Sequence, residues 1–179
     1  MIAGTIKQSE LRTYAVRQAM MESAANIKQA KLFGRATVFL SHSHKDQEIA
    51  KGLKNRLREQ DVDLYIDWQD STMPETPNRE TAEKIQERIL TCDIFLFLAT
   101  RNSLQSRWCP WEIGFADGKK SHDRIVVVPT QDDQGQYYGN EYMQLYHRLI
   151  ITAEMRKYGV FAPAADRGAL FEKFARQVK

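Results

Sequence analysis

The sequence has little cysteine and no long apolar run, and each lack argues against a class of protein. Only two of its 179 residues are cysteines, Cys92 and Cys109, and they form no CxxC pair. We expect both to be buried thiols, and the four histidines add no recognisable metal-ligand spacing, so no metal site is predicted. No apolar run approaches the ~18 residues that span a bilayer, and the first residues lack a signal-peptide core, which predicts a cytoplasmic protein.

Charge of one sign is also scarce. The net charge is +3, and no block of five or more like charges occurs, so the sequence offers no surface that would track the phosphates of a nucleic acid. Hydrophobic residues make up 42% and charged residues 27% of the chain, a balance typical of a globular protein. The length suits one domain with a short extension.

Strand-like and helix-like patterns alternate along the chain. The segment 93–100 is apolar at nearly every position, which is typical of a strand covered on both faces of a parallel sheet, so we expect it at the centre. The alternation predicts an α/β protein with a doubly wound sheet of about five parallel strands flanked by helices. The predicted strands are 36–40, 62–67, 93–100, 124–129 and 147–152.

Helices are predicted between these strands and at both ends of the chain. Ser43 and Asp46 match a capping box that would begin the helix after the first strand. Because proline is favoured in the first turn of a helix, Pro77 is expected to open one helix and Pro110 to lie in the first turn of the next. The helices expected at the two ends cover 9–31 and 166–178.

Polar side chains follow several of the predicted strands. Ser41 and His42 follow the first strand, Asp67 follows the second, and the loop after the third strand delivers residues from Ser106 to Glu112. Ligands in open α/β sheets bind outside the carboxyl ends of the strands. The sequence therefore predicts a ligand-binding cleft at this edge of the sheet.

Glu112 is surrounded by bulky side chains in the stretch SRWCPWEIG. In one interpretation it is an acid in the first turn of a helix, where the helix dipole favours it, and Trp108 and Trp111 are packing residues. In the other, the dipole keeps the carboxylate ionised beside an aromatic wall, which suits a ligand with a flat ring and a cationic centre. Periodicity alone does not decide between them.

Three motifs, in this order, resemble the Toll/interleukin-1 receptor (TIR) domain family. They are TVFLSHSHKD, then LYIDWQD with a long loop after it, then CDIFLFLATRNSLQSRWCPWEIGFA. The resemblance covers roughly Thr37 to Pro129, and the family's tryptophan, cysteine and glutamate signature corresponds to Trp108, Cys109 and Glu112. Together these motifs are specific, although each alone is weak.

One branch of this family cleaves NAD+, and the chain resembles its stand-alone bacterial members, which often act in anti-phage defence. The resemblance implies that Glu112 is the catalytic residue, that Trp108 lines the pocket and that NAD+ is a substrate rather than a cofactor. The expected products are nicotinamide and either ADP-ribose or a cyclic ADP-ribose. Ser43 stands where some NAD+-cleaving members carry a basic residue, so Lys45 or Arg101 becomes the candidate for phosphate contacts.

The chemistry of this reaction fits the residues. Breaking the nicotinamide–ribose bond builds oxocarbenium character on the ribose, and nicotinamide leaves as a neutral ring that needs no proton. One ionised carboxylate, Glu112, can therefore suffice. Ser41, His42, Asp67 and Ser106 are the further substrate-binding candidates, for ribose or phosphates. For the first three, a capping or turn role remains the alternative.

Two other functions stay open. The chain could be a non-catalytic TIR–TIR interaction module, in which case the loop from Trp68 to Asn78 and the helix with Glu112 would be docking surfaces. It could also be an enzyme like the nucleoside 2-deoxyribosyltransferases, which share a comparable sheet and a catalytic glutamate. Activity on nucleosides in place of NAD+ would distinguish the latter.

The resemblance also implies a domain organisation and partners. We expect a flavodoxin-like TIR domain over 35–179 and an N-terminal helical extension over 1–34, which packs against the domain or helps self-association. The expected partners are NAD+, further copies of the chain through TIR–TIR contacts, and a possible separate effector protein. Neither nucleic acid nor a membrane is expected as a partner.

Overall fold

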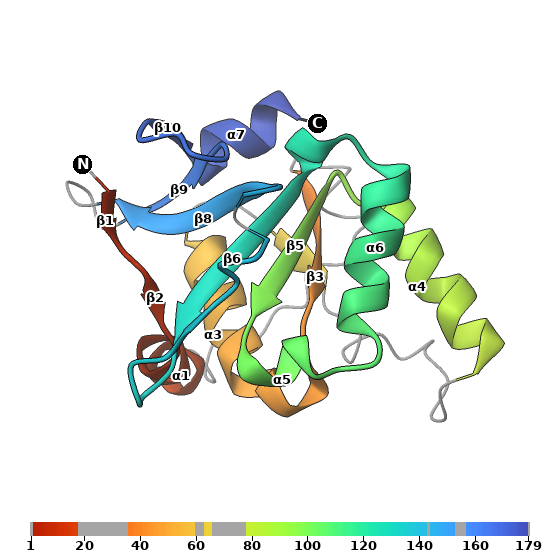
Figure 1. Cartoon of the computed structure of the whole chain (residues 1–179), viewed down its shortest axis with the longest axis horizontal. Helices are drawn as coiled ribbons and strands as arrows, with labels where there is room; N and C mark the ends of the chain where they lie inside the picture. The colour runs from red at the N-terminus through yellow and green to blue at the C-terminus, as the bar shows by residue number, and fades with distance from the viewer. Residues whose placement is uncertain are drawn as a thin grey trace.

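Five neighbouring strands of the sheet are parallel. The computed structural model describes residues 2–17, 36–59, 63–65, 78–142, 144–152 and 157–178. These five strands lie in the order β8-β6-β5-β3-β4, so β5 is the middle one, as predicted (Figure 1). The strands are β3 (Thr37–Ser41), β4 (Asp63–Tyr65), β5 (Ile94–Ala99), β6 (Ile125–Gln131) and β8 (His147–Thr152). The predicted α/β class with a mainly parallel sheet is confirmed.

Short strands that the sequence did not predict extend this sheet. Two of them, β9 and β10, continue it in antiparallel fashion beyond β8. Three others attach to strands inside the sheet: β1 is antiparallel to β8, β2 is parallel to β6, and β7 is antiparallel to β6. Their bounds are β1 (Ile2–Gly4), β2 (Ile6–Lys7), β7 (Tyr137–Tyr138), β9 (Tyr158–Phe161) and β10 (Gly168–Leu170).

Helices cover both faces of the sheet (Figure 1). On one face α1, α3 and α7 pack against the strands, and on the other face α4 and α6 do so. The α-helices are α1 (Gln8–Arg17), α3 (Gln47–Arg58), α4 (Arg79–Thr91), α5 (Arg101–Leu104), α6 (Cys109–Lys119) and α7 (Phe171–Gln177). Two short 3-10 helices, η1 (His44–Asp46) and η3 (His122–Arg124), complete the described elements. Among the described residues, no helix is both long and apolar enough to cross a bilayer.

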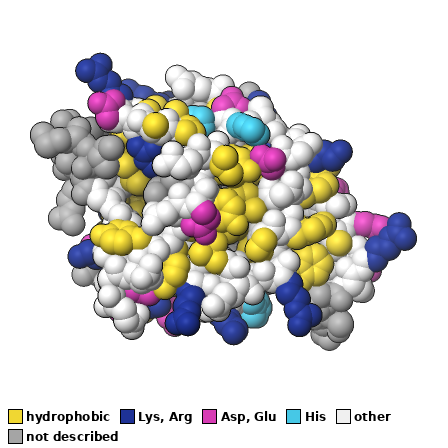
Figure 2. Space-filling model, viewed as in Figure 1, with side chains coloured by type: hydrophobic (Ala, Val, Ile, Leu, Met, Phe, Trp, Pro, Cys, Tyr) yellow, Lys and Arg dark blue, Asp and Glu magenta, His cyan; other side chains and the backbone are white. Residues whose placement is uncertain are grey.

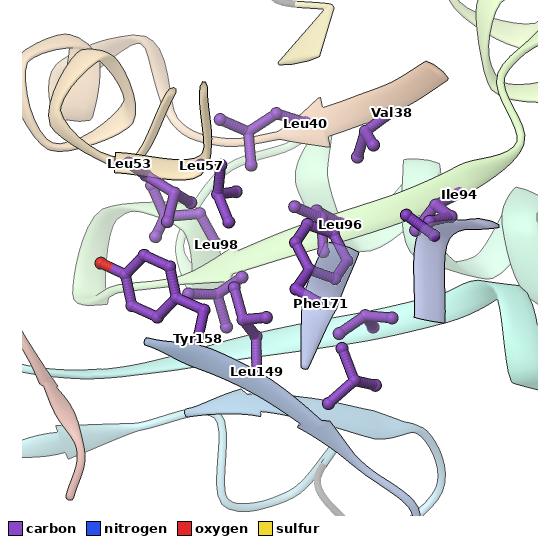
Figure 3. Close-up of a cluster of buried hydrophobic side chains, with 14 of the residues drawn as sticks. Val38, Leu40, Leu53, Leu57, Ile94, Leu96, Leu98, Leu149, Tyr158 and Phe171 are labelled. Carbon is purple, nitrogen blue, oxygen red and sulfur yellow. The ribbon is translucent and has the colours of Figure 1, made fainter. Parts of the chain in front are cut away.

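Alternation along the strands separates the buried residues into two clusters. In β5, Leu96 belongs to the first cluster, with α1, α3 and α7, whereas Phe95 and Phe97 belong to the second cluster, with α4 and α6. Successive side chains of a strand point to opposite faces, so a fully apolar strand supplies both clusters. Figure 3 shows part of the first cluster, including Tyr158, whose burial raises its pKa to about 12.

Three helix boundaries differ from the predictions. The predicted capping box is wrong: Ser43 accepts a hydrogen bond from the Lys45 backbone, but the Asp46 carboxylate is turned toward Thr100 and Asn102. Pro77 does not open α4, because that helix begins at Arg79 with Asn78 as its N-cap. The predicted last helix begins at Phe171, since residues 168–170 form β10.

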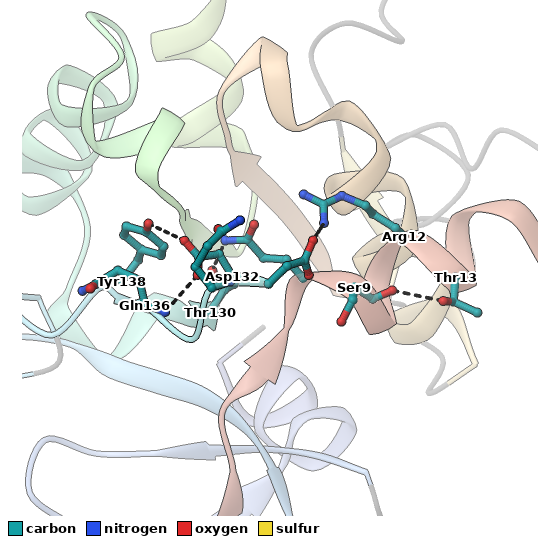
Figure 4. A network of polar contacts seen from close by, with 10 residues as sticks. Ser9, Arg12, Thr13, Thr130, Asp132, Gln136 and Tyr138 are labelled. Atoms are coloured by element: carbon teal, nitrogen blue, oxygen red, sulfur yellow. Dashed lines mark hydrogen bonds and ion pairs between the residues drawn. The ribbon is translucent and has the colours of Figure 1, made fainter.

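The described part of the N-terminal extension packs into the domain. The helix predicted over 9–31 is present as α1 up to residue 17, and its remainder lies outside the described residues. Ile6 and Leu11 are buried in the first cluster, and Gln8 Nε2 donates a hydrogen bond to Thr130 Oγ1 (2.9 Å). Arg12 forms an ion pair with Asp133 in the loop that follows β6 (Figure 4). Ile6 and Leu11 therefore share the hydrophobic core of the sheet.

On the face shown in Figure 2, hydrophobic side chains gather in the middle, over the region where β5 and β6 lie in Figure 1. The connection from β6 to β8 contributes aromatic rings to this face of the core, because Tyr138 and Tyr142 pack against the second cluster. Gly139 between them has φ +97° and lies so close to β5 that a Cβ would stand 2.8 Å from that of Ala99. A glycine is required there because L-residues rarely adopt this backbone conformation.

Candidate active site

Ser41 and Glu112, which were predicted from separate motifs, are joined by a hydrogen bond. The Ser41 hydroxyl donates to Glu112 Oε2 with an Oγ–Oε2 distance of 2.5 Å, in the range of hydroxyl-to-carboxylate bonds. Ser41 is the last residue of β3 and Glu112 lies in the first turn of α6. Both are buried, with exposed fractions of 1% and 4%. The pair lies at the carboxyl end of the parallel strands, where the sequence predicts the cleft.

The start of α6 explains how Glu112 reaches this position. Ser106 Oγ accepts hydrogen bonds from the backbone N–H groups of Trp108 (3.1 Å) and Cys109 (3.4 Å), and thereby satisfies the N–H of the first residue of the helix. Pro110 lies in the first turn, as predicted. Cys109, Ile113 and Glu112 are all buried, and residues three or four apart share one face of a helix. The carboxylate is thus held against the sheet beside the positive end of the helix dipole.

Aromatic side chains continue along α6 from the same turn. The rings of Trp108 and Trp111 meet edge to face with centroids 5.4 Å apart, and Trp111 stacks on Phe115 at 6.0 Å. Trp108 is half-buried against the second cluster, whereas Trp111 is 37% exposed. Three aromatic rings therefore lie along the first turns of α6, the helix that carries Glu112.

The structure places the other predicted residues as follows. His42 is largely buried, and its ring Nδ1 lies 3.1 Å from the backbone oxygen of Leu40. The Ser106 hydroxyl oxygen accepts hydrogen bonds from the backbone at the start of α6. Lys45 and Arg101 are exposed. Asp67 lies outside the described residues.

Two features of this edge were not predicted from the sequence. The first is the buried carboxylate of Asp46, which accepts hydrogen bonds from Thr100 and Asn102. The second is Tyr142, whose ring centroid lies 5.1 Å from that of Phe97 and whose pKa is raised by burial. For the buried Asp46 carboxylate, the signal available in the sequence was a polar residue after β5. Nothing in the pattern of the long β6–β8 connection marks Tyr142.

Within the parts of the chain that the structure describes, no three His, Cys, Asp or Glu side chains gather into a metal-binding group. Cys92 and Cys109 are both buried thiols. The described groups at this sheet edge include the Ser41 hydroxyl and the carboxylates of Glu112 and Asp46.

Comparisons with known proteins identify the family of the chain. A family model described as the TIR domain matches residues 38–156. The chain is similar to a protein of Bacillus cereus (strain MSX-D12) named probable 3′ cyclic ADP-D-ribose synthase ThsB′, with 32% identity over 134 residues, or 74% of this chain and 68% of the relative. It is also similar to a putative cyclic ADP-D-ribose synthase TIR2 of Cytobacillus dafuensis, with 28% identity over 94 residues, 51% of this chain and 24% of the relative.

Proposed function

Because the chain belongs to the TIR domain family, we propose that it is a cyclic ADP-ribose synthase that cleaves the nicotinamide–ribose bond of NAD+. The observation that carries the proposal is the buried Ser41–Glu112 pair at the carboxyl edge of the sheet. The names of the two relatives, both described as cyclic ADP-D-ribose synthases, support the product class.

In this proposal Glu112 stabilises a developing positive charge and does not transfer a proton. When the bond between ribose and nicotinamide breaks, its electron pair goes to the pyridinium ring, which leaves neutral. Positive charge then develops on the ribose, and the Glu112 carboxylate stabilises it, most strongly because the side chain is shielded from water. Attack by a nucleophile of the same ADP-ribose, with loss of a proton, closes a cyclic product. Attack by water gives linear ADP-ribose.

Ser41 and Trp108 have supporting roles in this proposal. The Ser41 hydroxyl donates to one oxygen of Glu112, which fixes the orientation of the carboxylate. Trp108, half-buried at the start of α6, offers its ring to the nicotinamide or adenine ring. His42, Ser106 and Asp67 remain proposed contacts to ribose or phosphate, with Lys45 or Arg101 supplying the positive charge.

The test is to incubate the purified protein with NAD+ at high protein concentration and to measure nicotinamide and the ribosyl product by chromatography and mass spectrometry. Nicotinamide release with a cyclic product is expected. Linear ADP-ribose alone would contradict the cyclisation. Release of bases from deoxynucleosides, with none from NAD+, would indicate a deoxyribosyltransferase. Inactivity on all of these substrates would indicate an interaction module.

Replacing Ser41 by Ala is expected to lower kcat about tenfold, because a hydrogen bond to a charged group contributes on the order of 1.5 kcal/mol. The matched control is Thr37→Val. Thr37 lies at the other end of β3, is equally buried, and its hydroxyl donates to Asp93 Oδ2 (2.8 Å). Steady-state kinetics should show the loss in the first variant only. Equal kcat values in the two variants would contradict the role of Ser41.

We further propose that the protein self-associates and that its product signals to a separate effector protein in anti-phage defence. Support for association comes from Leu90 on α4 and Trp111 on α6, since these two helices pack together and both side chains are exposed. Light scattering should show a mass above that of the monomer, and activity per molecule should rise with concentration. A monomeric mass at every concentration would contradict self-association. Two buried thiols fit the reducing cytoplasm, the location that we propose.

A further inference from the structure

Asp46 is a buried carboxylate that the proposed reaction does not use. Its side chain is 4% exposed, and it lies in η1, five residues after Ser41. Thr100 Oγ1 donates to one carboxylate oxygen (2.5 Å), and Asn102 Nδ2 donates to the other (2.7 Å). Burying a charged group is costly unless hydrogen bonds compensate for the lost water. The fold retains this carboxylate with a partner on each oxygen.

The two partners belong to the segment that leads to the catalytic helix. Thr100 follows β5 and is the N-cap of α5, where its hydroxyl oxygen accepts a hydrogen bond from the Ser103 backbone (3.0 Å). Asn102 lies within α5. Only four residues separate the end of α5 from the beginning of α6. Asp46 thus ties the loop after β3 to the turn through which the chain enters α6.

Ser41 and Glu112 depend on the relative position of these same two segments. The ladder between β3 and β5 ends with the pairing of Ser41 and Phe97. Beyond it, the chain diverges into the loop that contains Asp46 and into the turn that leads to Glu112. We propose that Asp46 is a positioning residue, which holds these two segments at the separation that the Ser41–Glu112 pair requires for the reaction. This inference rests on the proposed role of Glu112.

A similar carboxylate at the other end of the same strands provides a matched control. Asp93 lies just before β5, and its Oδ2 accepts hydrogen bonds from the backbone N–H and the hydroxyl of Thr37, both at 2.8 Å. Asp93 therefore ties β3 to β5 at their amino ends, away from Glu112. Loss of either carboxylate removes two hydrogen bonds between segments that adjoin β3 and β5, but only Asp46 adjoins the proposed site.

The experiment compares Asp46→Ala, Asn102→Asp and Asp93→Ala for melting temperature, kcat and KM on NAD+. We expect the first two variants to lose 10- to 100-fold in kcat with KM changed less than threefold, because a displacement on the order of 1 Å costs as much as 10²-fold. Asp93→Ala should lose melting temperature but keep kcat within twofold. Asn102→Asp places two carboxylates face to face. If Asp46→Ala does not fold, the kcat of Asn102→Asp still tests the proposal.

A swapped pair separates positioning from general stability. In the double variant Asp46→Asn with Asn102→Asp, an amide at 46 can donate to a carboxylate at 102 and still accept from Thr100, so kcat should recover at least fivefold over Asn102→Asp. A kcat in Asn102→Asp equal to that of the wild type, or no recovery in the swap, would overturn the inference. Glu112→Gln is run in parallel: if it keeps full activity, the proposed function fails first, and the inference falls with it.

Discussion

Replacing Glu112 by Gln is expected to lower nicotinamide release from NAD+ by about 10³-fold, the scale on which removing one preorganised electrostatic contact acts. Glutamine has the same shape, and its amide oxygen can still accept the hydrogen bond that Ser41 donates. The variant therefore loses the negative charge and keeps the packing at the start of α6. Initial rates of nicotinamide formation, measured at saturating NAD+, report the loss directly.

Glu48→Gln is the matched control for this experiment. Glu48 is also an acid in the first turn of a helix, α3, but it is exposed. Both variants remove one favourable interaction with a helix dipole, so their melting temperatures report that shared effect. Only Glu112→Gln should lose activity. If the two variants release nicotinamide equally fast, Glu112 is a dipole-stabilising acid and the assignment of the active site is wrong.

Replacing Gly52 by Val is expected to destabilise the protein by about 3 kcal/mol, at the upper end of the usual cost of overpacking. A Cβ at residue 52 would stand only 1.9 Å from the backbone oxygen of Leu11, so α1 would have to move away from α3. That movement would expose Leu11, which is buried in the first cluster. Urea unfolding at constant pH, followed by circular dichroism, measures the change in free energy.

Gly114→Ala provides the opposite expectation within the same experiment. Gly114 lies inside α6, and a Cβ there would have nothing within 4 Å. Alanine is favoured over glycine in a helix by about 0.8 kcal/mol, so this variant should be slightly more stable than the wild type. Wild-type stability of Gly52→Val would mean that α1 does not pack closely on α3.

The parallel strands could be predicted because a strand that is buried on both faces is apolar at nearly every position. Every residue of β5 is apolar, a pattern that is typical of a strand covered on both faces of a parallel sheet. The strands β2 and β7 have two residues each, too few for any period, and they are strands only because β6 is beside them. Such short strands form because of tertiary contacts, which a local sequence pattern does not reveal.

The sequence predicts where in the fold the candidate site lies, but not the contacts within it. The rule that ligands bind at the carboxyl ends of parallel strands brought Ser41 and Glu112 to one edge. Their hydrogen bond joins residues 71 positions apart, which no local motif encodes. For Asp46 a local pattern gave a wrong prediction. Its spacing from Ser43 fits a local helix cap, but the donors to its carboxylate lie 54 and 56 residues away in the sequence.

The N-terminal strand also bears on the order in which the chain can fold. Ile2 pairs with Thr152, and Ile6 pairs with Thr130, so two short strands depend on partner strands that are distant in the sequence. Contacts between such distant residues require a large loop to close and therefore form slowly. Strands β1 and β2 can therefore join the sheet only after β8 and β6 are in place.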